Sequence, residues 1–170
     1  MNKRDHVINA VLLSIGISVL LSPPDVLDAF MVVLTVAPPV ILGALLPDLD
    51  TVFGVHRKTF HNVWVLAFIM SFPLLFGNLY YVWIGVLSHF TLDLLGNRYG
   101  MGLLYPLPGF YDIPVGVNVD SRLAGVVTLL VTALELVFVY LLLTVGLEAH
   151  LAVPNLPTLL RDVLAPFGGV

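Results

Sequence analysis

The chain has 170 residues, of which 59% are hydrophobic and only 11% are charged. Soluble domains carry about 25% charged residues, so this composition excludes an ordinary soluble domain and predicts an all-α polytopic membrane protein. The lack of cysteine excludes disulfides and thiolate metal sites. With a net charge of −4 and seven basic residues, nucleic acid is not an expected partner; membrane lipids are.

Five apolar runs follow one another, and we expect each to form a transmembrane helix of one domain. They cover 7–21, 26–46, 63–76, 79–95 and 123–145. A span needs about 20 apolar residues, so the second and fifth runs are long enough. The other three are short and require polar helix ends or a thinned bilayer. The C-terminal tail, 154–170, has apolar residues at helical spacing and is expected to be an amphipathic helix on the membrane surface.

The basic residues predict an orientation. With the N-terminus in the cytoplasm, six of the seven Lys and Arg residues fall on the cytoplasmic side, and only Arg161 falls outside. The six are Lys3, Arg4, Arg57, Lys58, Arg98 and Arg122. The sequence therefore predicts a multi-pass protein of the inner or plasma membrane with a cytoplasmic N-terminus.

A polar group interrupts the apolar chain between the second and third runs. Asp48 and Asp50 follow the second run, and His56 and His61 precede the third. Carboxylate oxygens and imidazole nitrogens are ligands for Zn²⁺ and Mn²⁺. Two other interpretations stay open here: a Pro-Asp pair is an ordinary helix stop, and a histidine beside Arg57 also suits contact with lipid headgroups.

The predicted topology brings further ligands to the same membrane depth. His6 opens the first helix at its cytoplasmic end, while His89 and Asp93 close the fourth and share one helix face. A His–Asp pair that only stabilises helix packing is the alternative, but ionisable groups inside a span are costly and usually functional. The predicted metal ligands are His6, Asp48, Asp50, His56, His61, His89 and Asp93.

This set suits hydrolysis. Seven candidates exceed the three protein ligands of a typical catalytic zinc site, so we expect one or two divalent ions, with some residues orienting the ligands. Such ions activate water and hold the oxygens of a phosphoester. The expected catalytic residues are Asp48, Asp50, His61, His89 and Asp93. Arg57 and Lys58 are expected to bind an anionic headgroup of the substrate, and ordinary positive-inside charge explains them equally well.

Polar groups elsewhere have less defined roles. Glu135 lies near the centre of the fifth run and is expected to be a neutral, hydrogen-bonded carboxyl. The loop 96–122, which contains Asp112 and Asp120, either covers the site or is an ordinary interfacial connection with aromatic anchors. His150 is predicted on the opposite side of the membrane, away from the site.

The ordered motifs resemble the YdjM-like family, described as LexA-regulated, membrane-bound, metal-dependent hydrolases. The resemblance covers roughly residues 1–145 and rests on His6, Gly43-x-Leu-Leu-Pro-Asp48-x-Asp50, His56-Arg-x-x-x-His61 and Ser88-His89-x-x-x-Asp93. One departure is Phe60, which separates Thr59 from His61 where the family usually has Thr directly before the histidine. The resemblance implies a hydrolase. A more distant similarity to zinc-dependent phospholipases C and nucleases implies a lipid-like phosphoester as substrate.

Two other functions remain open from the sequence. A transporter of metal ions or small solutes would favour ligands near the membrane midplane, broken helices and internal repeats. A non-catalytic membrane protein would use a closed metal site only to tie helix ends together. Ligands gathered at one end of the helices, without a repeat, favour the hydrolase.

Overall fold

The computed structural model describes residues 1–152, apart from 22–25, 78, 114 and 119–120, with side chains described as far as Val145. The predicted surface helix 154–170, Asp120 and the side chain of His150 lie outside the described residues.

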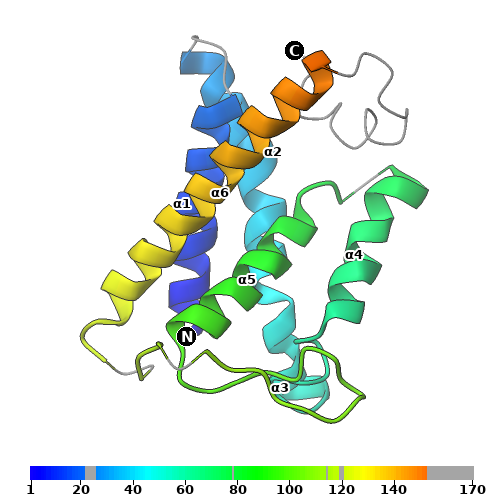
Figure 1. Cartoon of the computed structure of the whole chain (residues 1–170), viewed down its shortest axis with the longest axis vertical. Helices are drawn as coiled ribbons and strands as arrows, with labels where there is room; N and C mark the ends of the chain where they lie inside the picture. Colours follow the sequence, from blue (N-terminus) through cyan, green and yellow to red (C-terminus); the bar gives the residue numbers. More distant parts are fainter. Residues whose placement is uncertain (22–25, 78, 114, 119–120, 153–170) are drawn as a thin grey trace.

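Each of the five predicted runs forms a helix (Figure 1). In chain order these are α1 (Lys3–Leu21), α2 (Val26–Leu45), α4 (Val63–Phe76), α5 (Val82–Gly96) and α6 (Ala124–Ala152). A 3-10 turn, η1 (Pro47–Leu49), and a one-turn helix, α3 (Asp50–Phe53), follow α2. Within the described residues there is no strand beyond two isolated bridges in the α5–α6 loop. The predicted all-α class is confirmed.

Three of the helical segments are long and apolar enough to cross a membrane, namely Lys3–Leu21, Val26–Phe53 and Ala124–Val145. α4 has 14 residues and α5 has 15, which correspond to about 21 and 23 Å, short of the roughly 30 Å of a hydrocarbon core. Together they form a hairpin whose tip lies well below the far ends of α1, α2 and α6 (Figure 1). A polytopic membrane architecture follows, with three of the five predicted spans at full length.

Two glycines bring α2 and α5 into direct backbone contact. A Cβ atom on Gly43 would lie 2.0 Å from the Val82 carbonyl oxygen, and one on Gly85 would lie 2.0 Å from the Val40 carbonyl oxygen. Helices in membranes approach this closely where small residues face each other. The crossing places His89, one turn after Gly85, beside the C-terminal end of α2.

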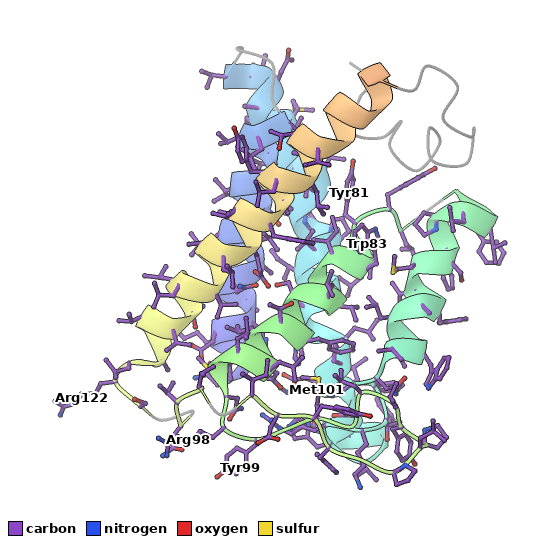
Figure 2. The ribbon with its side chains drawn as sticks, viewed as in Figure 1. Tyr81, Trp83, Arg98, Tyr99, Met101 and Arg122 are labelled. Atoms are coloured by element: carbon purple, nitrogen blue, oxygen red, sulfur yellow. The ribbon has the colours of Figure 1, made fainter. Side chains whose placement is uncertain are left out.

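The start of α1 and the ends of α2 and α5 lie at the same end of the molecule as α3 and the α5–α6 loop (Figure 1). Arg98 and Arg122 project from the loop at this end (Figure 2). The segments that carry the six basic residues predicted to share one membrane side therefore do lie together.

Candidate metal centre

Four side-chain atoms converge at this end of the bundle. The Nε2 atoms of His61 and His89 are 3.0 Å apart. Asp48 Oδ1 lies 4.0 and 3.9 Å from these two nitrogens, and Asp93 Oδ2 lies 3.8 and 3.9 Å from them. Asp48 is the most exposed of the four side chains, at 11%, whereas the other three are at most 2% exposed. Residues from η1, from the turn before α4 and from α5 thus meet around one point.

Hydrogen bonds on the far side of each ring fix the two tautomers. The Nδ1–H of His61 donates to Asp50 Oδ2 at 2.7 Å, and the Nδ1–H of His89 donates to the Ala44 carbonyl at 2.6 Å. Because the carboxylate and the carbonyl accept these hydrogen bonds, both Nε2 atoms carry lone pairs when the rings are neutral. Burial lowers the pKa of His61, which favours its neutral ring. Two lone pairs that face each other at 3.0 Å repel, and a bound cation removes this repulsion.

The separations also fit a metal ion. Zn–N and Zn–O bonds of about 2.0–2.1 Å in a tetrahedral site put neighbouring ligand atoms about 3.3–3.4 Å apart. The distances of 3.0 to 4.0 Å among these nitrogen and oxygen atoms bracket that value. These buried His and Asp side chains can therefore hold a metal ion, as the sequence predicted.

His6 extends the centre on the α1 side. Its ring stacks on that of His89, with centroids 3.7 Å apart, and it is 1% exposed. Its Nε2 lies 3.3 Å from Asp93 Oδ1, which also accepts from the Met1 nitrogen at 2.5 Å. Within the described residues neither nitrogen of His6 has a hydrogen-bond partner of good geometry. A buried imidazole whose nitrogens make no well-formed hydrogen bond is costly, so His6, next to Asp93, fits a ligand of the same centre.

Asp50 contacts His61 through Nδ1, the ring nitrogen that faces away from the four converging atoms. Its Oδ2 accepts from His61, and its Oδ1 accepts from His56 Nδ1 at 2.8 Å. With both oxygens engaged and no exposed surface, Asp50 orients imidazoles and does not belong to the four converging atoms. His56 is 45% exposed and, with Asp48 and His61, forms a second group of side chains able to hold an ion.

The two predicted substrate-binding residues are positioned differently. Arg57, held at a left-handed φ of 64°, directs Nη2 to within 3.5 Å of Asp93 Oδ2 and donates from Nη1 to the Tyr99 carbonyl at 2.5 Å. Lys58 points away, and its ammonium lies 5.0 Å from the centre of the Phe110 ring. Arg57 therefore belongs to the centre, whereas Lys58 contacts the loop.

Asn62 holds the turn that carries His61 in place. Its Oδ1 accepts from the backbone nitrogens of Trp64 and Val65, which caps the first turn of α4. Its Nδ2 donates to the carbonyls of Lys58 and Thr59. The turn that carries His61 is thereby bonded to the helix that follows it.

A second buried polar network is built around Asn9, a residue that the sequence analysis does not single out. Asn9 of α1 donates from Nδ2 to Thr132 Oγ1 at 3.0 Å and to Glu135 Oε2 at 2.9 Å, both on α6. Its Oδ1 accepts from the hydroxyl of Ser88, the neighbour of His89. Glu135 is thus hydrogen-bonded as expected, although its Oε1 has no partner within the described residues. The network joins three helices directly behind the centre.

Replacing Asn9 with alanine should destabilise the fold by about 2 kcal/mol, because Asn9 makes three interhelical hydrogen bonds and such bonds in membranes contribute about 0.6 kcal/mol each on average. The melting temperature of the purified protein in detergent measures this loss. Thr35→Ala is the matched control, since Thr35 bonds only to its own helix at the Met31 carbonyl and is exposed. Equal melting temperatures for Asn9→Ala and Thr35→Ala would contradict the stabilising role of the network.

Comparison of the chain with protein-family models, with curated proteins and with solved structures gave no match. Function is therefore inferred from the geometry of the centre and from the chemistry of its residues.

Proposed function

We propose that the protein is a membrane-bound, metal-dependent hydrolase that cleaves an ester or phosphoester bond of a lipid-like substrate at the cytoplasmic face of the inner or plasma membrane. The observation that carries the proposal is the pair of lone-pair-bearing Nε2 atoms of His61 and His89, 3.0 Å apart. The carboxylate of Asp93 adds a third ligand atom, and the carboxylate of Asp48 faces the same point. The resemblance of these residues to the YdjM-like family leads to the same proposal.

Zn²⁺ and Mn²⁺ are the ions that best suit mixed imidazole and carboxylate ligands. The two oxygens of Asp93 point to different histidines: Oδ2 faces His61 and His89, while Oδ1 faces His6. With His6, His61 and His89 on its two sides, Asp93 would serve as a ligand in a centre of one or two ions. A divalent ion in this position supplies Lewis-acid activation of water and of the scissile ester or phosphoryl group.

The protein's own residues then have distinct roles. Asp50 and the Ala44 carbonyl keep His61 and His89 in the tautomers that present Nε2 to the centre. Asp48, the most exposed of the four converging side chains, is placed to accept a proton from the attacking water. The Arg57 guanidinium beside Asp93 offsets the negative charge that develops on a phosphoester.

One observation favours a non-catalytic alternative. Four converging protein atoms also suit a closed structural site, which keeps no exchangeable position. In the catalytic proposal Asp48 is free to act as a base, so three protein ligands remain, as in catalytic zinc sites. The position of the centre at the helix ends argues against a transporter, which would bind its ion near the midplane.

Metal removal tests the hydrolase proposal. The purified protein, in vesicles that contain phospholipid substrates, should release phosphate or headgroup, and a chelator should abolish this release. Adding back Zn²⁺ or Mn²⁺ should restore it, because the ligand residues remain in place. Hydrolysis that persists after complete chelation would contradict the proposal. Uptake of the ion into sealed vesicles would instead favour a transporter.

A further inference from the structure

The end of the molecule that holds the centre also carries an apolar surface, which we call the cap. Val52 and Phe53 of α3 are 72% and 74% exposed. The remaining residues of the cap, which are also large, apolar and exposed, are Leu49, Val55, Leu107 and Phe110. Exposed apolar patches outside the spanning part of a protein mark sites of contact with another protein or with a membrane.

Direct contacts join the two segments of the cap. The Gly102 N–H donates to the Arg57 carbonyl at 2.7 Å, which ties the α5–α6 loop to the turn after α3. The Lys58 ammonium lies 5.0 Å from the centre of the Phe110 ring and links the same two segments. α3 and the loop therefore form one surface, which lies beyond the last turn of α2 (Figure 1).

The length of α2 places the cap near the boundary of the membrane, and the charges around it adjust its depth there. Its 20 residues extend about 30 Å, which equals the thickness of a typical hydrocarbon core. When α2 fills that core, η1 and α3 lie at its boundary, in the headgroup layer. Apolar side chains such as Phe53 are stable there because they reach about 5–10 Å into the boundary with the acyl chains.

The charges at the end of the molecule that carries the cap complement an anionic surface. The exposed basic residues at this end of the molecule are Lys3, Arg4, Arg98 and Arg122. Asp112 is the exposed carboxylate there, within the described residues. Arg98 and Arg122 project outward from the loop (Figure 2). Exposed Lys and Arg next to apolar anchors are attracted to anionic lipid headgroups.

We propose that the cap is embedded in the headgroup layer of an anionic phospholipid bilayer, so that the centre behind it is reached from the bilayer and not from bulk water. His61, His89 and Asp93 are at most 2% exposed, so their side chains have little direct contact with bulk water. The position of the cap stands by itself, whereas the passage of a lipid substrate to the centre rests on the proposed hydrolase function.

Single cysteines test the position of the cap, because the chain has none of its own. Phe53→Cys and Phe110→Cys would carry an environment-sensitive dye in vesicles of phosphatidylcholine and phosphatidylglycerol. Leu134→Cys, at an exposed position half-way along the spanning part of α6, is the deep reference. Nitroxide-labelled lipids and aqueous iodide then report the depth of each dye.

We expect both cap dyes to be quenched by shallow nitroxides, at a depth of about 5–10 Å into the boundary, and to be protected from iodide. In phosphatidylcholine alone they should lie less deep. Strong quenching by iodide, or disulfide cross-linking between copies with protection from both quenchers, would overturn the proposal. Equal depth in both membranes would overturn the choice of anionic lipid. An embedded cap without any phospholipid hydrolysis would refute the proposed enzymatic function while the cap placement stands.

Discussion

Replacing His89 with alanine is expected to remove the bound transition metal and to lower the hydrolysis rate at least about 10³-fold, which corresponds to roughly 4 kcal/mol of transition-state stabilisation. The substitution deletes one of the two Nε2 atoms at the centre and the ring on which His6 stacks. Elemental analysis of the purified protein gives the metal content, and release of phosphate or headgroup gives the rate.

Thr91→Ala is the control for this experiment. Thr91 lies two residues further along α5, and its hydroxyl bonds only to the Leu87 carbonyl of the same helix. The Thr91→Ala protein should retain its metal content and its rate, and both variants should keep their helical circular dichroism. A folded His89→Ala protein with full metal content and unchanged rate would contradict the metal centre itself.

The helices and the convergence of ligands were predictable because both follow from one-dimensional signals. The apolar runs are separated by polar turns, and the positions of Lys and Arg place alternate helix ends on one side. His6, His89 and Asp93 therefore had to lie at one depth, and the structure brings them together. The third and fourth runs are short in the sequence, and α4 and α5 are short in the structure. The pattern could not show that this pair ends well below the far ends of the other helices (Figure 1), because polar residues can also extend a short run.

The different roles of Asp48 and Asp50 were not predictable from the sequence. Asp48 and Asp50 are two residues apart and belong to different elements, η1 and α3. The local 3-10 turn directs Asp48 towards Nε2 of His89. The same turn directs Asp50 towards the Nδ1 atoms of His56 and His61. A carboxylate that binds a metal and one that orients its ligand have the same sequence signature.

The role of Asn9 as the partner of Glu135 was not predicted, because an amide carries no charge and is a weaker sign of a buried polar site than an ionisable group. A signal was present: Asn9 follows His6 by three residues, so the two share a helix face, and Ser88 directly precedes His89. An amide inside an apolar helix needs a partner, and small polar side chains on neighbouring helices supply it. Such residues are worth testing wherever they flank candidate ligands.

Asp50→Ala is expected to weaken metal binding by about 10- to 100-fold, as removal of the outer partner of a ligating histidine typically does. The buried Nδ1–H of His61 would lose its acceptor, and its ring would no longer be held towards His89. Asp50→Asn should retain most of the affinity. An amide oxygen placed at the Oδ2 position can still accept from His61 and from the Phe60 N–H, which lies 3.4 Å away.

Titration of the metal-free variants with Zn²⁺ against a competing chelator measures both affinities. In the Asp50→Asn variant the new amide nitrogen would face His56, which is 45% exposed and can change tautomer at little cost. The contrast between the two variants separates an orienting residue from a ligand, because a direct carboxylate ligand loses its charge in either substitution. Equal losses for Asp50→Asn and Asp50→Ala would therefore show that Asp50 binds the metal directly.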